Sequence, residues 1–175
     1  MSAAPRTDAV LVMGVAGSGK STVGLALAER IDAEFLDADD LHSADAVAKM
    51  AAGVPLEDAD RYPWLDRVAA AIRLANGPIV VACSALRRDY RDRIRAGAGQ
   101  AVVTVHLDGS PELLAARLAA RSGHFMPSSL LDSQLATLEP LGAGEAGFAI
   151  GIELAPEVVV DEIADRLRAW RPAEP

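Results

Sequence analysis

A glycine-rich segment directly after a short apolar run constrains this chain more than any other feature. Residues 9–13 form the apolar run, and residues 14–21 read Gly-Val-Ala-Gly-Ser-Gly-Lys-Ser, which matches G-x-x-x-x-G-K-[ST]. Residues 23–31 then carry apolar side chains at three- and four-residue spacing, as an amphipathic helix does. A strand, a glycine loop and a helix in this order predict a backbone cradle for phosphate groups at the start of the helix.

The roles of the loop residues follow from the motif. Lys20 is predicted to reach the β- and γ-phosphates of a nucleotide, and Ser21 to offer its hydroxyl to Mg²⁺. The pattern does not fit a dinucleotide fingerprint, because Ala16 stands where G-x-G-x-x-G needs its second glycine. The residues predicted to bind phosphate are Gly14, Val15, Ala16, Gly17, Ser18, Gly19, Lys20, Ser21 and Thr22.

Further apolar runs predict the remaining strands. Residues 79–83 and 102–107 lack two-residue alternation, as strands buried on both faces do, and weaker strands are predicted at 34–36 and 148–152. Helical patterns separate these runs, and Ser110 followed by Pro111 is a typical helix start. The alternation predicts an α/β fold: one five-stranded parallel sheet with helices on both faces and ligands at the carboxyl ends of the strands. We expect residues 1–175 to form a single domain.

Composition excludes several classes of function. The net charge of −8 disfavours binding to nucleic acid or to an anionic membrane surface. Cys83 is the only cysteine, which excludes an intrachain disulfide and a multi-cysteine zinc site. No apolar stretch approaches the roughly 20 residues that cross a bilayer, and the first residues do not resemble a signal peptide, so a cytoplasmic location is expected.

An acidic cluster follows the predicted strand at 34–36. Asp37 and Asp39 are two positions apart, so in an extended chain their side chains point the same way, and Asp40 adds a third charge. Three neighbouring acids repel one another unless a cation or a hydroxyl-bearing ligand is present. No carboxylate ends the run at 79–83, so we predict Asp37 as the Mg²⁺ ligand beside Ser21, and Asp39 as the group at the acceptor hydroxyl.

Beyond the loop, the chain resembles the gluconate kinases, small relatives of shikimate kinase and the nucleoside monophosphate kinases. The resemblance is carried, besides the loop, by segments 35–42, 49–56, 60–65, 83–87, 90–92, 123–126 and 133–134. It implies a P-loop NTPase fold with a helical lid, and ATP- and Mg²⁺-dependent phosphorylation of D-gluconate at its terminal hydroxyl. It also implies a homodimer.

The resemblance and the charge pattern together place an acceptor-binding segment at about 37–76. Lys49 and Arg61 have an alternative reading as surface charges paired with Glu57 or Asp60, and His42 one as a cap or packing residue. Trp64 and Met50 are predicted to lie in the core. The residues predicted to contact the acceptor are Asp39, His42, Lys49, Arg61, Arg87, His124 and Gln134.

Relatives of this fold close a lid over ATP after the fourth strand, which here corresponds to about residues 117–140. Arg117 and Arg121 are four positions apart, so we predict that they share one face of the helix begun by Ser110 and act on the transferring phosphoryl group. Gly123 is predicted to end that helix and serve as a hinge.

Two positions on the acceptor side depart from the usual gluconate kinase pattern, because Ser43 and Ala46 stand where Pro and Asn are usual. They leave open a kinase for another small acid, such as shikimate or another sugar acid. A third alternative, from another class, is an ATP-binding regulatory protein that has lost catalysis. A GTP-dependent switch is disfavoured, because neither lysine follows an asparagine as guanine recognition requires.

Overall fold

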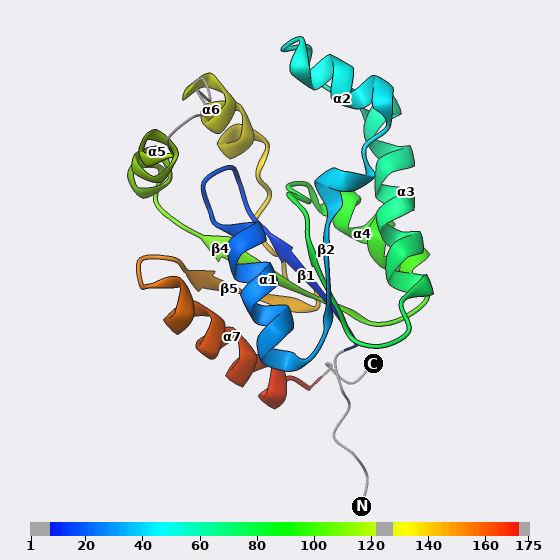
Figure 1. Cartoon of the computed structure of the whole chain (residues 1–175), viewed down its shortest axis with the longest axis vertical. Helices are drawn as coiled ribbons and strands as arrows, with labels where there is room; N and C mark the ends of the chain where they lie inside the picture. Colours follow the sequence, from blue (N-terminus) through cyan, green and yellow to red (C-terminus); the bar gives the residue numbers. More distant parts are fainter. Residues whose placement is uncertain (1–7, 122–127, 172–175) are drawn as a thin grey trace, which may run out of the picture.

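Residues 8–121 and 128–171 are described by the computed structural model, and in them strands alternate with helices as predicted (Figure 1). Strands lie at all five predicted positions. The elements are β1 (Ala9–Met13), α1 (Lys20–Ile31), β2 (Glu34–Asp37), η1 (Ala38–Leu41), α2 (Ala44–Ala51), α3 (Asp58–Leu74), β3 (Ile79–Ala82), α4 (Arg88–Ala98), β4 (Val102–Asp108), α5 (Pro111–Ala120), α6 (Ser128–Thr137), β5 (Gly147–Gly151) and α7 (Pro156–Ala169).

The strands form one sheet in the order β2-β3-β1-β4-β5, with every neighbouring pair parallel. The strand that feeds the glycine loop is therefore central, and its residues Ala9 to Met13 are all fully buried. The predicted five-stranded parallel sheet is confirmed.

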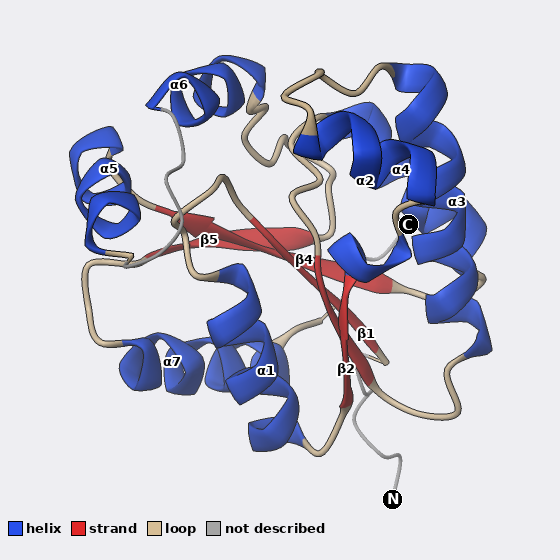
Figure 2. Cartoon of the chain, turned by 45° about the horizontal axis from the view of Figure 1, so that its top comes forward, coloured by secondary structure: helices blue, strands red, loops and turns tan. Residues whose placement is uncertain are grey.

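Two-residue periodicity divides the sheet between two cores. Val10 and Val12 face one side, where they join buried residues of α1 and α7 such as Leu27 and Ile163. Leu11 faces the other side and joins buried residues of α3 and α4. Both faces of each central strand are thus covered, which explains why these strands read as continuous apolar runs. Figure 2 shows α1 and α7 on one side of the sheet and α3 and α4 on the other.

Serine caps fix the starts of two helices that flank the site. The Ser110 hydroxyl accepts a hydrogen bond of 3.2 Å from the Leu113 amide at the start of α5, as predicted. Ser43 does the same for α2, accepting from the Ala46 amide at 3.1 Å. The two acceptor-side departures from the gluconate kinase pattern, Ser43 and Ala46, thus belong to one helix cap.

Two predictions about single elements are wrong. Arg117 and Arg121 do not share a helix face, because α5 ends at Ala120 and Arg121 has extended backbone angles at the helix C-cap. Met50 is not in the core: it lies on α2 and is 44% exposed. Trp64 is buried as predicted, and its indole N–H donates to the Ala38 carbonyl. The proposed hinge Gly123 lies outside the described residues.

The carboxyl ends of the strands meet at one edge of the sheet, and the helices around this edge frame the site. α5 and α6 stand on one side of it and η1 with α2 on the other, with the glycine loop between them (Figure 1). Among the helices of the described part of the chain, none is long and apolar enough to span a bilayer.

Candidate active site

The loop between β1 and α1 has the backbone of a phosphate cradle. Gly17 and Gly19 have φ angles of 83° and 89°, in the left-handed region that side chains other than glycine avoid. Gly19 is also the N-cap of α1, and no side chain caps its amides. The first-turn N–H groups of this helix are therefore available to an anion, in the place where the helix dipole favours negative charge.

Gly17 lets α5 approach the loop closely. A Cβ at this position would meet the Leu114 carbonyl and a Leu118 side-chain carbon, each at 3.0 Å. Only glycine therefore tolerates both the backbone angle and the contact, and the close packing brings the C-terminal end of α5 to the loop.

Lys20 is held under the loop, with its Nζ donating to the Val15 carbonyl at 3.2 Å. Burial lowers the pKa of Lys20, and the positive charge of Arg121 acts in the same direction, while Asp39 and Asp37 oppose the shift. A partly buried ammonium whose pKa is lowered is stabilised when the negative charge of phosphates comes next to it.

The predicted pair of metal ligands is assembled in the structure. The Ser21 hydroxyl donates to Asp37 Oδ2 at 2.6 Å, and Asp37 Oδ1 accepts from the Asp39 amide at 3.0 Å. The hydroxyl proton points at the carboxylate, so the lone pairs of Ser21 remain for a cation. No group of three or more His, Cys, Asp or Glu side chains in the described residues could hold a metal ion by itself. One hydroxyl and one carboxylate nevertheless suit Mg²⁺, which takes most of its ligands from water and phosphate.

Asp39 lies in η1 beside this pair, and its side chain is exposed although its pKa is perturbed. Its side chain keeps 79% of its surface open to solvent. The surrounding protein atoms nevertheless reduce its solvation enough to raise the pKa of Asp39, and the negative charge of Asp37 raises it further. A carboxylate with a raised pKa is a better proton acceptor, as the predicted role at the acceptor hydroxyl requires.

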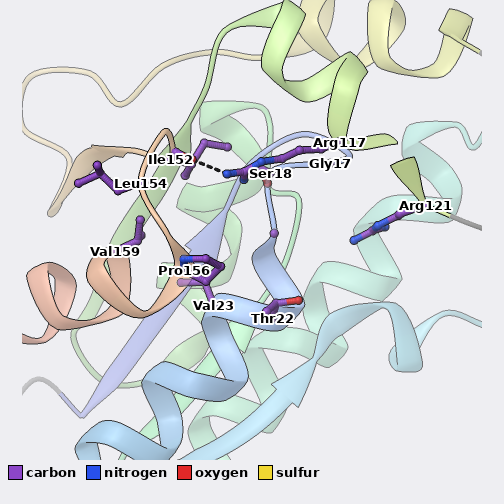
Figure 3. Close-up of a pocket in the computed structure, with 11 residues that line it drawn as sticks. Gly17, Ser18, Thr22, Val23, Arg117, Arg121, Ile152, Leu154, Pro156 and Val159 are labelled. Carbon is purple, nitrogen blue, oxygen red and sulfur yellow. Dashed lines mark hydrogen bonds between the residues drawn. The ribbon is translucent and has the colours of Figure 1, made fainter. Parts of the chain in front are cut away.

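A pocket lies against the glycine loop and is lined by α5, by the segment after β5 and by the start of α7 (Figure 3). Arg117 lines it and donates to the Ile152 carbonyl, and Arg121 reaches it from beyond the helix end. The two predicted arginines thus line one pocket at the loop although they share no helix face. The lining residues are Gly17, Ser18, Gly19, Thr22, Val23, Arg117, Arg121, Ile152, Leu154, Pro156 and Val159.

Two predicted acceptor residues, Arg61 and Arg87, converge on one aromatic ring. Their guanidinium carbons lie 5.9 Å and 4.9 Å from the centre of the Tyr90 ring. Asp58 joins the group: it accepts from the Tyr90 hydroxyl at 2.7 Å and lies 3.7 Å from Arg61 and 3.5 Å from Arg87. We call Arg61, Arg87, Asp58 and Tyr90 the arginine cluster. It holds two positive charges around one carboxylate, as the binding of a carboxylate ligand requires.

Lys49 and His42 make the contacts that were given as alternatives to acceptor binding: Lys49 pairs with Asp60, and His42 packs against Trp64. Lys49 Nζ donates to both carboxylate oxygens of Asp60, at 2.7 and 2.9 Å. His42 stacks on Trp64, with ring centres 4.3 Å apart, and its Nε2 is 3.9 Å from Asp39. Burial lowers the pKa of His42, which favours the neutral ring.

Gln134 contacts the phosphate cradle directly. Its Oε1 accepts a hydrogen bond of 2.6 Å from the Ala16 amide, so α6 touches the loop. The neighbouring Leu131 anchors the helix, since it is buried in the same core as Val15. His124, the last predicted acceptor residue, lies outside the described residues.

Sequence reasoning missed several residues of the site. Asp58 and Tyr90 belong to the arginine cluster, and only their nearness in sequence to Arg61 and Arg87 hinted at it. The apolar side chains of Ile152, Leu154, Pro156 and Val159 are indistinguishable from core residues until the fold brings them to the loop. Cys83 needs no functional role, because burial raises the pKa of its thiol to about 12 and leaves it unreactive.

Comparison with known proteins gives a consistent result. Residues 10–141 match the family described as an AAA domain. The chain is 44% identical to a gluconokinase from Gluconobacter oxydans (strain 621H), over 91% of each chain.

The fold has close counterparts among solved structures. A gluconokinase from Sinorhizobium meliloti 1021 superposes with a TM-score of 0.86 at 42% identity, covering 94% of each chain. A shikimate kinase from Acinetobacter baumannii has a TM-score of 0.60 at 20% identity and covers 93% of each chain, which shows a shared fold only.

Proposed function

Because the chain belongs to the gluconokinase family, we propose that it transfers the γ-phosphoryl group of ATP to the terminal hydroxyl of D-gluconate, giving 6-phosphogluconate. The observation that carries this proposal is the position of Asp39. It lies beside Ser21 and Asp37 at the phosphate loop, and the same carboxyl edge of the sheet carries a cluster rich in arginine. The site thus offers a phosphate cradle, a proton acceptor and cations for a carboxylate.

On the donor side, the backbone N–H groups of residues 14–22 would hold the phosphates, with Lys20 neutralising their charge. The apolar side chains of Ile152, Leu154 and Pro156 suit the flat nucleobase, next to the Arg117 guanidinium. Ser21 and Asp37 would hold a Mg²⁺ ion, which when bound contributes further neutralisation of phosphate charge.

The chemical step then needs positioning more than covalent help. The acceptor oxygen attacks the γ-phosphorus, and the new P–O bond forms as the bond to the β–γ bridging oxygen breaks. ADP leaves with that electron pair, and the hydroxyl proton passes to the carboxylate of Asp39. Arg121 lines the pocket at the loop and is suited to stabilise the charge on the transferring group. Arg117 would join it there only by releasing the Ile152 carbonyl.

On the acceptor side, the proposed segment 37–76 contributes Asp39, His42, Lys49 and Arg61, and Arg87 joins from beyond β3. The carboxylate of gluconate would bind at the arginine cluster, where two guanidinium groups share one aspartate. Lys49 would have to exchange its bond to Asp60 for a substrate hydroxyl or carboxylate.

The segment 117–140 is proposed as the cover of the donor site, with Arg117, Arg121 and Gln134 as its contacts to the loop. Residues 122–127 of this segment lie outside the described part of the chain. The homodimer and the cytoplasmic location stay predictions, as does the absence of nucleic-acid and membrane partners.

A coupled ADP-release assay with Mg-ATP tests the proposal. D-gluconate should give turnover, and D-glucose, which lacks the carboxylate, should give much less and serves as the matched control. If shikimate or another sugar acid gave higher turnover than D-gluconate, that acid would be assigned as the acceptor instead. Tight ATP binding without turnover on any acceptor would instead support the regulatory protein.

A further inference from the structure

A fully buried ion pair lies beside the arginine cluster, and the phosphoryl transfer described above does not use it. Arg91 of α4 and Glu145 of the connection between α6 and β5 have side chains that are 0% and 1% exposed. Their two hydrogen bonds are parallel, with Nε to Oε1 at 2.8 Å and Nη2 to Oε2 at 2.9 Å. Because burying two charges offsets most of their attraction, the main effect of such a pair is to hold two segments in one geometry.

The first segment held by Arg91 is the turn after β3. Its Nη1 donates to the carbonyls of Ala85 and Leu86, at 3.0 and 3.2 Å. Ala85 has a φ angle of 41°, in the left-handed region that a residue with a Cβ avoids. Strained backbone persists only where the surrounding structure stabilises it, and here the two hydrogen bonds from Arg91 do so. Arg87 directly follows Leu86, so the conformation of this turn determines the position of Arg87 in the arginine cluster.

The second segment is the stretch from Leu138 to Glu145, which we call the strap. The Glu139 amide donates to the Leu86 carbonyl at 2.8 Å, and the Glu139 carboxylate accepts from the Arg88 amide at 2.6 Å, at the start of α4. Glu145 closes the strap by accepting from the Gly142 amide at 2.9 Å. The strap therefore forms hydrogen bonds to the same turn as Arg91 does.

We propose that Arg91 and Glu145 are a positioning pair for the acceptor site: they lock the turn and the strap together and thereby fix Arg87 toward the acceptor carboxylate. The role assigned to Arg87 rests on the proposed function. The nucleotide side has its own anchors in α6, because Gln134 bonds the Ala16 amide and Leu131 is buried. Loss of the pair should therefore weaken acceptor use more than ATP use.

The test is Glu145→Gln, compared with Asp66→Asn as a matched control. Asp66 forms the same two-bond pair with Arg93 of α4, at 2.7 and 2.8 Å, but on the surface and away from the strap. For Glu145→Gln we expect the KM for gluconate to rise at least tenfold and the KM for ATP to change less than threefold. Asp66→Asn should leave both constants within twofold of the wild type.

Hydrogen exchange of the backbone amides from 83 to 88 gives a readout that needs no substrate. Glu145→Gln should increase the exchange rates there at least tenfold, and Asp66→Asn should not. If the wild type fails to phosphorylate gluconate, the proposed function is wrong, and the exchange rates still decide whether the pair positions the turn. Unchanged exchange, or equal rises in both KM values, would overturn the positioning role.

Should Glu145→Gln not fold, Glu139→Ala removes the exposed bond from the Arg88 amide to the Glu139 carboxylate and leaves the backbone bond to the Leu86 carbonyl in place. The same rise in exchange and in the KM for gluconate, of at least threefold, is then expected. A folded Glu139→Ala variant with wild-type values in both measurements would contradict the proposal.

Discussion

Ser21 and Asp37 lie 16 positions apart in sequence and are joined by a hydrogen bond of 2.6 Å from Oγ to Oδ2. The bond connects the first turn of α1 with the end of β2, the edge strand of the sheet. It leaves the lone pairs of the hydroxyl for a cation and holds the carboxylate beside them, so the two residues act as one unit toward the metal.

We expect Ser21→Ala and Asp37→Asn each to raise the Mg²⁺ concentration for half-maximal activity roughly 10–100-fold, as the loss of an oxygen ligand or its partner does elsewhere. A magnesium titration at fixed ATP measures this. Ser110→Ala, which removes a cap hydroxyl remote from the proposed metal site, should leave the titration unchanged. Wild-type magnesium dependence in both site variants would rule out the pair as the metal site.

Lys20→Ala should lower kcat by roughly 10²–10³-fold, because the transferring phosphoryl group loses a partly buried positive charge. The only other lysine, Lys49, provides the comparison. Lys49→Ala should act mainly on the KM for gluconate, since Lys49 lies in the acceptor segment on α2. Steady-state kinetics with both substrates varied separates the two, and equal effects from the two variants would contradict the assigned roles.

The decrease of kcat/KM for gluconate at low pH, its acid limb, should follow the protonation of Asp39. A proton acceptor must be ionised, so activity should rise with pH through the pKa of Asp39, which desolvation and Asp37 raise above the ordinary value of about 4. Asp39→Asn should abolish this limb and lower kcat/KM by roughly 10²–10⁴-fold. Asp40→Asn is the control and should keep the limb. An acid limb that survives in Asp39→Asn belongs to another group.

Arg117→Ala should raise the KM for ATP about tenfold, a change equivalent to the loss of about 1.4 kcal/mol of binding. The reason is its place in the pocket, where it bonds the Ile152 carbonyl. Arg166→Ala is the control, because Arg166 also donates to a carbonyl next to this site, that of Ala149 in β5, but from α7 and outside the pocket. A larger change in the KM for gluconate than in that for ATP would count against a donor-side role.

The buried pair should also govern stability in acid. Hydrogen bonds from Arg91 lower the pKa of Glu145 to about 2, below its ordinary value of 4.5. A depressed carboxyl pKa stabilises the fold fully above the ordinary value, and this contribution is lost as pH falls from 4.5 toward 2.

Glu145→Gln should therefore cost about 3–5 kcal/mol at neutral pH, because it leaves Arg91 charged and buried without its partner. Because glutamine does not titrate, the free energy of unfolding of the variant should also decrease less than that of the wild type as pH falls from 4.5 toward 2. Urea unfolding from pH 2 to pH 7 measures both effects, and parallel pH profiles for variant and wild type would refute the assignment.

Local patterns predicted the backbone of the donor half of the site. The glycine motif specifies its own backbone conformation, and the apolar runs specify strands because their residues must be buried on both faces. The cradle, all five strands and the Ser110 cap therefore follow from short segments of sequence. The acidic cluster at Asp37 was found in the same way, because two-residue spacing in an extended chain needs no knowledge of the fold.

The acceptor half was predicted less well, because its side chains meet through contacts between distant elements. Arg61 and Arg87 could be named from a family pattern, but not their shared contact with Tyr90 and Asp58. The predicted contact of Gln134 with the acceptor stays a prediction, and its bond to the Ala16 amide of the cradle could not be read from the sequence. The contacts of a side chain with residues distant in sequence depend on how the helices pack, and the neighbouring residues in sequence do not specify that packing.

The sequence by itself determined the chemistry available to this protein: a phosphate cradle, a lysine, a serine and a carboxylate in the order that phosphoryl transfer requires. Only the tertiary structure decided how these groups meet. It placed Arg121 beyond the end of α5, brought Ser21 to Asp37, and buried Arg91 against Glu145. The physical reason is that a motif is held by bonds along the chain, whereas a site is held by packing and hydrogen bonds between segments far apart in it.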